Sequence, residues 1–268
     1  MSITPVDETF ELLTPSAALL PVLTGLRSAL TRLGDTQTKT SSRVWENIPV
    51  MDISSGIARF SIWMDGYDRG VIPSDDSEVQ NDINHRLSTD YEIMSPSELG
   101  DRFAVMMNRA SVTSRYRRIA ETPDITRLFK DSRALGWQGF DVVSASETEK
   151  RLIRNRRMFV DYFRQDFDWT RLRAIELSRA AALIDYAIYM EMVTKEEAEP
   201  YARRVTVEAM TRYPSWNTFA RALLTAQIFE SLNDGEIRAL QQITPIEEIL
   251  QWHLEKVWCD TPWPRLAN

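Results

Sequence analysis

The chain has little cysteine, histidine and glycine: one cysteine, two histidines and nine glycines among 268 residues. A single cysteine, Cys259, cannot form an intrachain disulfide, so we expect a reducing compartment, the cytoplasm. No apolar run approaches the ~18 residues that a membrane span needs. The first residues, MSITPVDETF, lack a basic-then-apolar pattern, so we expect no secretory signal. Few glycines and few alternating β-branched runs argue against a β-rich fold or a nucleotide-binding α/β sheet.

Common signatures of catalysis and metal binding are also missing. The sequence has no Gly-x-Ser-x-Gly elbow, no Walker loop and no Gly-x-Gly-x-x-Gly. His85, His253 and Cys259 do not complete a zinc ligand set. Residues 65–76 (DGYDRGVIPSDD) resemble a calcium loop only in part, because a tyrosine and an arginine stand where oxygen ligands are needed. We therefore predict no metal and no cofactor. A Ser-His-Asp triad stays open, since its members need only be neighbours in space.

Helical patterns fill most of the chain and predict a mainly α protein, a single multi-helix bundle with a helical N-terminal extension. Residues 1–95 are predicted as that extension, which is acidic, and residues 96–268 as the bundle domain. Capping signals begin helices at Ser95, Thr194, Ser215 and Thr244. The expected helices are residues 15–33, 54–65, 96–120, 123–136, 147–165, 174–193, 195–212, 216–229 and 245–254.

Residues 174–193 predict the central helix of the bundle. Its apolar residues lie on most sides, which is typical of a helix surrounded by others. Glu176 and Arg179 are three residues apart and can meet on one flank. Because a buried charge without a partner is costly, we expect them to pair with each other or with neighbours. The candidate binding residues are Glu176, Arg179, Asp185 and Trp216. Trp216 is also expected to anchor the core, and no catalytic residue is assigned.

The runs IELSRAAALIDYAIYMEMVTKEEA (175–198) and PSWNTFARALLTAQIF (214–229) resemble the bacterial family called domain of unknown function 1266. Three family motifs match, at Glu176-Leu177 with Arg179, at Glu196-Glu197-Ala198 and at Ser215-Trp216. The chain departs from the family's usual residues at Ile175, Asp185, Ala187, Glu191, Ala226 and Gln227. The resemblance covers about residues 137–230. It implies a helical bacterial domain, and the family has no established activity to carry over.

A basic stretch invites a second hypothesis. Residues 150–179 hold nine Lys or Arg against four Asp or Glu, and a stripe of the expected helix carries Lys150, Arg154, Arg157 and Arg164. One interpretation is an anion site for phosphate, nucleic acid or an acidic partner. The other is a solvated face that pairs with the acidic residues 35–95. The net charge of −7 disfavours sequence-independent nucleic-acid binding, so we favour the solvated face.

Two classes of function remain. The first is a non-catalytic protein that binds another protein, as a regulator, adaptor or toxin-neutralising (immunity) partner. The second is an enzyme or small-ligand binder that uses Glu176 and Arg179 in a cleft of the bundle. Convergence of Glu176, Arg179 and Asp185 in a deep pocket would favour the second. We predict a protein partner, no sequence-specific nucleic acid and no membrane, and the oligomeric state stays open.

Overall fold

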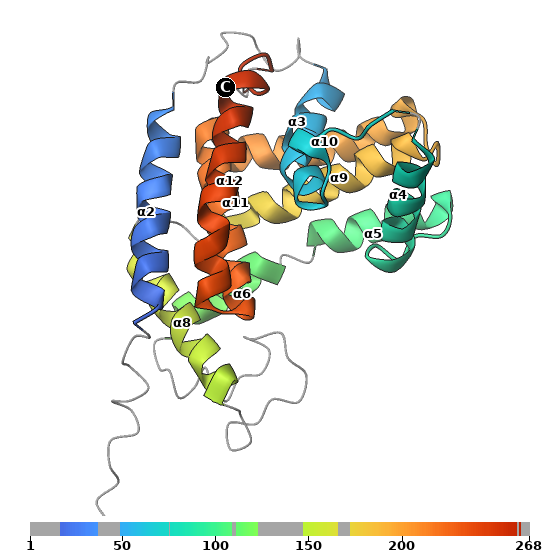
Figure 1. Cartoon of the computed structure of the whole chain (residues 1–268). Helices are drawn as coiled ribbons and strands as arrows, with labels where there is room; N and C mark the ends of the chain where they lie inside the picture. The colour runs from blue at the N-terminus through green and yellow to red at the C-terminus, as the bar shows by residue number, and fades with distance from the viewer. Residues whose placement is uncertain are drawn as a thin grey trace, which may run out of the picture.

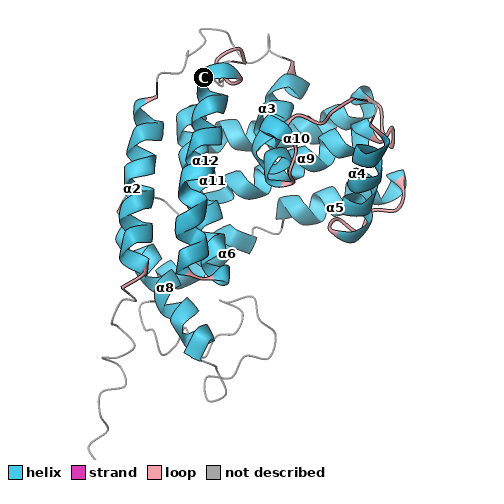
Figure 2. Ribbon diagram, viewed as in Figure 1, coloured by secondary structure: helices cyan, strands magenta, loops and turns pink. Residues whose placement is uncertain are grey.

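The computed structural model of the chain describes residues 17–36, 49–74, 76–108, 111–122, 147–165, 172–261 and 263. Within these ranges the regular elements are helices and there is no strand (Figure 2), so the predicted mainly α class is confirmed. The helices are α2 (Leu19–Asp35), α3 (Val50–Met64), η2 (Asp68–Gly70), α4 (Ser77–Thr89), α5 (Pro96–Asn108), α6 (Ser111–Glu121), α8 (Glu147–Phe163), α9 (Ala174–Tyr189), α10 (Lys195–Arg212), α11 (Trp216–Ser231), η5 (Leu232–Asp234) and α12 (Glu236–Lys256).

Helix α9 is the centre of the fold, as predicted (Figure 1). It contacts α3, α4, α5, α6, α10 and α11. Between Ala174 and Ala187 only Arg179 and Asp185 are less than fully buried. Its run of alanines keeps the side chains at the contacts small, which shortens the distance between packed helix axes. Against α3, the Ser178 hydroxyl donates to the Ile57 carbonyl at 2.8 Å.

Helices α2 and α12 pack side by side and run in the same direction. A Cβ atom added at Gly25 would lie 3.4 Å from Ile243 Cδ1 and 3.8 Å from Leu240 Cδ1. About two turns further along α2, the Arg32 guanidinium donates to both carboxylate oxygens of Glu247. From the first contact to the second, the residue numbers increase along both helices. The N-terminal ends of α2 and α12 therefore lie at the same end of the molecule.

Two of the four capping predictions are confirmed in full. Thr194 and Glu197 form a reciprocal capping box at the start of α10, and the Ser215 hydroxyl accepts from the Thr218 amide at the start of α11. The prediction at Thr244 is wrong, because α12 begins at Glu236 and continues through Pro245. The apolar face of α12 is buried on both sides of this proline, and that burial outweighs the one lost backbone hydrogen bond.

Two further features of the helices differ from the prediction. The helix expected over 96–120 is two helices, α5 and α6, because a side chain from α9 holds the amide groups at the start of α6. Helix α4 was not predicted, since only Ile83 and Leu87 on it are buried. Leu20 of α2 is 58% exposed. The helix predicted over residues 123–136 lies outside the described residues.

An aromatic cluster packs the segment after α12 onto the bundle, and its members are Trp216, Phe219, Trp258 and Trp263. The rings of Trp216 and Trp258 are stacked at 4.6 Å, and Trp263 meets Trp216 edge-on at 4.5 Å. Each of the two stacked indoles donates its N–H to a carbonyl, Trp216 to Thr261 at 2.7 Å and Trp258 to Gly56 at 2.9 Å.

Gly56 allows α3 to approach this cluster closely. A Cβ atom at this position would lie 3.1 Å from Trp216 Cη2, which is tighter than ordinary van der Waals contact. The cluster joins α3, α11 and the end of α12 into one core, to which α2 and α8 also contribute buried residues. The division of the chain at residue 95 stays a prediction, although helices on both sides of it share this core.

Candidate functional site

The three charged candidates on α9 do not converge. Nine residues separate Glu176 from Asp185, which is about two and a half turns, so their side chains leave α9 on opposite sides. Arg179 pairs with Glu230 on α11 at 2.7 Å. Asp185 accepts a hydrogen bond from the Ser55 hydroxyl on α3 at 3.0 Å. The predicted pairing is therefore with neighbours, because each of these side chains is held by a different helix.

Glu176 holds the start of α6. Its carboxylate accepts from the backbone N–H of Val112 at 2.9 Å and of Thr113 at 3.3 Å. These amides belong to the first turn of a helix, where N–H groups lack an intrahelical partner and the helix dipole favours a negative charge. Burial raises the pKa of Glu176, while the Thr113 amide and the charge of Arg173 act against that rise. Glu176 thus fixes α6 on α9.

Arg179 belongs to a shared ion pair. The Glu230 carboxylate accepts from Arg179 through one oxygen at 2.7 Å and from Arg115 on α6 through the other at 3.0 Å. The Glu230 side chain is 16% exposed, whereas that of Arg179 is 40% exposed. The Arg179 charge also acts on Asp65 and Tyr91. This pair therefore links three helices and extends toward a second polar group beside α9.

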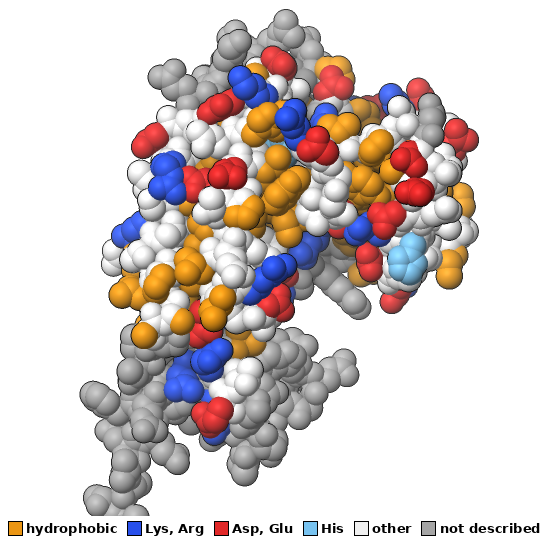
Figure 3. Space-filling model, in the orientation of Figure 1, with side chains coloured by type: hydrophobic (Ala, Val, Ile, Leu, Met, Phe, Trp, Pro, Cys, Tyr) orange, Lys and Arg blue, Asp and Glu red, His pale blue; other side chains and the backbone are white. Residues whose placement is uncertain are grey.

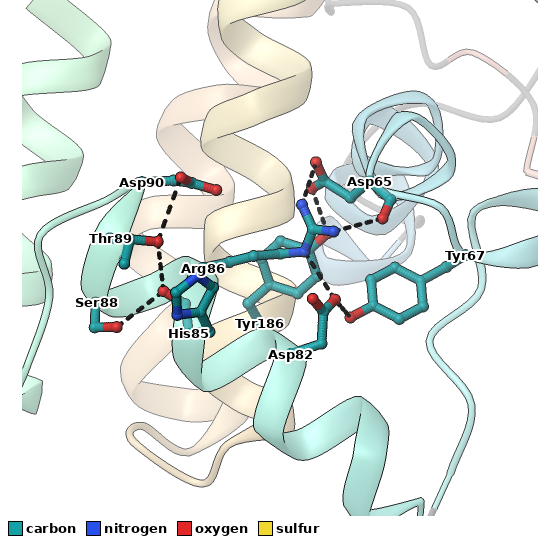
Figure 4. A network of polar contacts seen from close by, with 9 residues as sticks. All are labelled: Asp65, Tyr67, Asp82, His85, Arg86, Ser88, Thr89, Asp90 and Tyr186. Atoms are coloured by element: carbon teal, nitrogen blue, oxygen red, sulfur yellow. Dashed lines mark hydrogen bonds and ion pairs between the residues drawn. The ribbon is translucent and has the colours of Figure 1, made fainter.

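The second group is centred on Arg86 of α4 (Figure 4). Its guanidinium donates to Asp82 Oδ2 at 2.8 Å, to Asp65 Oδ1 at 3.1 Å and to the Asp65 carbonyl at 2.7 Å. The hydroxyls of Tyr67 and Tyr186 donate to Asp82 and Asp65 respectively, each at 2.6 Å. Figure 4 shows Arg86 lying between the two carboxylates. Its guanidinium fastens α4 to Asp65 at the end of α3, and Tyr186 connects α9 to the same Asp65. We call the two groups together the polar seam.

Burial and charge set the ionisation of the polar seam. Burial raises the pKa of Asp65, against the hydrogen bond from Tyr186 and the charge of Arg86. Burial and the neighbouring carboxylates raise the pKa values of Tyr67 and Tyr186, which keeps both phenols protonated as donors. Burial alone would lower the pKa of Arg86, but Asp82 and Asp65 raise it overall. The seam is thus an internally paired set of charges that positions helices.

Asp185 has a different environment on the other flank of α9. Burial raises its pKa to about 6, against the Ser55 hydrogen bond and the positive charges of Arg59 and Lys195. The side chain is partly exposed. A carboxyl group of this kind changes charge near neutral pH, which is the range of a general base or a pH-sensitive contact. It stands apart from Glu176 and Arg179.

Trp216 and His253 are core residues. Trp216 is 1% exposed and lies inside the aromatic cluster. His253 is 0% exposed, and its Nε2 is 3.1 Å from the Arg69 carbonyl. Burial lowers the pKa of His253 to about 4, so the ring is neutral at physiological pH. Both side chains are used in packing.

The basic stripe on α8 is paired mainly within its own helix. Lys150 contacts Glu147 at 2.9 Å, and Arg157 contacts Asp161 at 2.7 Å. Arg154 is 3.7 Å from the same Glu147, and Arg164 is exposed. These ion pairs lie within α8, and the expected pairing of the stripe with residues 35–95 stays a prediction. Side chains one helical turn apart were the nearer partners.

The loop that partly matches a calcium motif is a packing element. Gly70 has φ of 68°, and a Cβ atom there would lie 2.1 Å from the Arg59 carbonyl oxygen, so only glycine fits. The Arg69 guanidinium stacks over the Trp252 ring at 5.0 Å. Nowhere in the part of the chain that the structure describes are three His, Cys, Asp or Glu side chains grouped as metal ligands.

An exposed apolar surface lies at the common N-terminal end of α2 and α12. Leu20 is 58% exposed, Ile237 70% and Leu240 40%. Leu240 packs beside Gly25 of α2, and Ile237 is one turn before it on α12. Figure 3 shows hydrophobic side chains gathered over this end of the two helices. We call Leu20, Ile237 and Leu240 the apolar edge.

Sequence reasoning missed most partners in this site. Nothing in the spacing connects Arg179 with Glu230, 51 residues away, or Tyr186 with Asp65, 121 residues away. The apolar edge had a weak signal, because Ile237 and Leu240 are three residues apart and fall outside the helix predicted over 245–254.

Comparisons with known proteins identify the family of the chain. None of the described helices is both long enough and apolar enough to cross a membrane. No curated protein and no solved structure matches the chain. A family model described as "Protein of unknown function (DUF1266)" matches residues 75–266, which extends the resemblance of residues 137–230 in both directions. With most of its length matched from α4 to the aromatic cluster, the chain belongs to the DUF1266 family.

Proposed function

We propose that this protein is a non-catalytic helical module of the bacterial cytoplasm that binds another protein, in a regulatory, adaptor or toxin-neutralising role. The apolar edge is the observation that carries the proposal. Exposed aliphatic residues one turn apart on a helix are the usual anchors of helix-mediated protein contacts, and adjoining exposed apolar residues mark interaction sites on folded proteins. The single cysteine supports a reducing compartment.

The alternative was an enzyme or ligand binder built on Glu176 and Arg179. That reading needs side chains that converge and remain available to a ligand. Glu176 is 5% exposed and occupied by the amides of α6, and Asp185 leaves α9 on the opposite side. The geometry therefore supports the protein-binding function better.

The test compares wild-type protein with the double variant Ile237→Glu/Leu240→Glu. A carboxylate at each anchor would be desolvated on binding without a partner, which is strongly unfavourable. Proteins that co-purify from the native cytoplasm are quantified by mass spectrometry. We expect the recovered amount of at least one co-purifying protein to fall about tenfold or more with the double variant. A tenfold change corresponds to about 1.4 kcal/mol of binding free energy.

Val207→Glu is the matched control, because Val207 is also an exposed aliphatic residue, 38% exposed on α10. It should retain the same partner as wild type. Circular dichroism and thermal melts establish that all three proteins fold. Identical sets of co-purifying proteins for wild type, control and edge variant would contradict the proposal.

A further inference from the structure

Helix α12 carries an exposed stripe with an opposite charge at each end. Its members are exposed and are spaced by three, four and three residues: Arg238, Gln241, Pro245 and Glu248. Residues spaced in this way are neighbours on one side of a helix. Leu240 and Thr244 are also exposed, so every exposed side chain between the two charges is uncharged. A partner can cover this stretch without desolvating a charge in its middle.

The two end charges are not used inside the fold. The buried carboxylate of Glu247, one residue before Glu248, is paired with Arg32 of α2. Arg238 and Glu248, by contrast, have no ion-pair partner among the residues that the structure describes. Both charges are exposed in the single chain and remain available to a second molecule.

The stripe complements itself when it is reversed. Positions 238 and 248 are equally far from Ile243, and so are positions 241 and 245. A second α12 that runs antiparallel and is centred at the same level therefore places its Glu248 beside Arg238 and its Arg238 beside Glu248. The two charged contacts are then about 15 Å apart along the helix. A two-fold contact uses the same patch on both chains, and this patch brings opposite charges together.

Apolar surface beside the stripe supplies the area for such a contact. Leu240 is 40% exposed and Ile237 70%, and both lie within one turn of the stripe. Figure 1 shows α12 in front of α11 with α2 beside it, so two copies would bring four helices together. Exposed ion pairs contribute little affinity but fix orientation, and burial of the aliphatic side chains drives the association.

We propose that the partner of this stripe is a second copy of the chain, docked antiparallel on α12 in a two-fold dimer. Two contacts between Arg238 and Glu248 flank its uncharged centre. The net charge of −7 opposes contact between copies elsewhere, which favours this uncharged stretch. The inference goes beyond the proposed function, which concerns a different protein. Because both contacts use Leu240, the dimer and that complex exclude each other.

Sedimentation of the purified chain over a concentration series tests the dimer. We expect a monomer–dimer equilibrium with Kd on the order of 10 µM, because one face of two helices is a modest interface. A wild-type chain that is still monomeric at about 1 mM overturns the inference. This failure is distinct from failure of the proposed function, which is judged by the proteins that co-purify.

Charge reversal tests the antiparallel arrangement. Arg238→Glu and Glu248→Arg each place like charges in contact twice in every dimer, so each variant alone should dimerise at least about tenfold more weakly. An equimolar mixture of the two variants should form a heterodimer with near wild-type affinity, because opposite charges meet again at both contacts. The double variant Arg238→Glu/Glu248→Arg should likewise recover the homodimer.

Lys195→Glu is the matched control, because it changes the net charge by the same amount at an exposed position of α10. It should dimerise as wild type does. Thermal melts establish that every variant folds. A dimer that is indifferent to the single reversals, or a mixture that stays as weak as its components, contradicts the antiparallel contact on α12.

Discussion

The aromatic cluster and the charged groups of α9 satisfy their polar atoms in different ways. In the cluster, Trp216 and Trp258 each bury a large ring and meet their single N–H requirement with one carbonyl. On α9, each charged side chain depends on a partner from another helix, as Arg179 does on Glu230. Burial of rings contributes stability wherever they pack, whereas a buried ion pair gains little over apolar packing and fails badly when one partner is removed. The cluster stabilises the fold, and the charges specify which helices meet.

This difference predicts that the cluster carries the largest single effects on stability. Trp258→Ala removes a ring that is 0% exposed and stacked on Trp216, and should lower the free energy of unfolding by about 3–5 kcal/mol. Chemical denaturation measures it. Met94→Ala, at a side chain that is 77% exposed, is the control and should change little. A loss below about 1 kcal/mol for Trp258→Ala would show that the aromatic cluster does not carry the largest single effects on stability.

Within the charged groups, the shared carboxylate should matter more than either of its arginines. Glu230→Ala leaves Arg115 and Arg179 without their common acceptor and should cost about 2–4 kcal/mol. Arg179→Ala leaves Glu230 paired with Arg115, and the lost side chain is 40% exposed, so its cost should be about 1 kcal/mol.

Urea denaturation of the two variants decides the order. Replacing Arg179 by Met together with Glu230→Gln should recover part of the loss of Glu230→Ala, because less uncompensated charge remains. Equal losses for Glu230→Ala and Arg179→Ala would show that the carboxylate is not shared in the way that the distances indicate.

The same contrast explains what the sequence could predict. The Thr194 and Ser215 caps and the burial of α9 were predictable, because caps and periodicity are properties of consecutive residues. The partners of Glu176 and Arg179 were not, because their positions depend on how distant helices pack. The continuous α12 was missed because Thr244 and Pro245 form a good local start signal, and burial of Ile243 and Ile246 on either side overrides it. The apolar edge was also not predictable from the sequence, because it is formed by residues of both α2 and α12.

Each region also contains a group that makes stability depend on pH, with opposite signs. Asp185 has a pKa raised to about 6 by burial, so the folded state holds its proton more tightly than the unfolded state. The free energy of unfolding therefore falls as pH rises from about 4 to 6. His253, whose ring lies 5.2 Å from that of Trp258, has a pKa lowered to about 4 by burial. The unfolded state binds its proton more tightly, so stability rises across about pH 4 to 6.5.

These two contributions should partly cancel in the wild-type protein, and single substitutions should expose each one. Asp185→Asn should give an unfolding free energy that rises by about 1–3 kcal/mol between pH 4.5 and 6.5, and His253→Gln one that falls over the same range. The contribution of Asp185 to the pH dependence is the smaller, because its side chain is partly exposed and water screens it.

Burial also raises the pKa values of Asp65 and Glu176, so these two groups add to the fall in unfolding free energy of the His253→Gln protein. Glu98→Gln serves as the surface control: the amides of Met94 and Ser95 lower the Glu98 pKa, so its stabilising contribution is fully present above the ordinary pKa of a glutamate. Its loss should therefore shift the unfolding free energy by a constant amount over this range and leave the pH dependence as in wild type. Urea melts across this pH range measure all four proteins. Parallel curves for the Asp185 and His253 variants would mean that the two regions do not titrate as their burial requires.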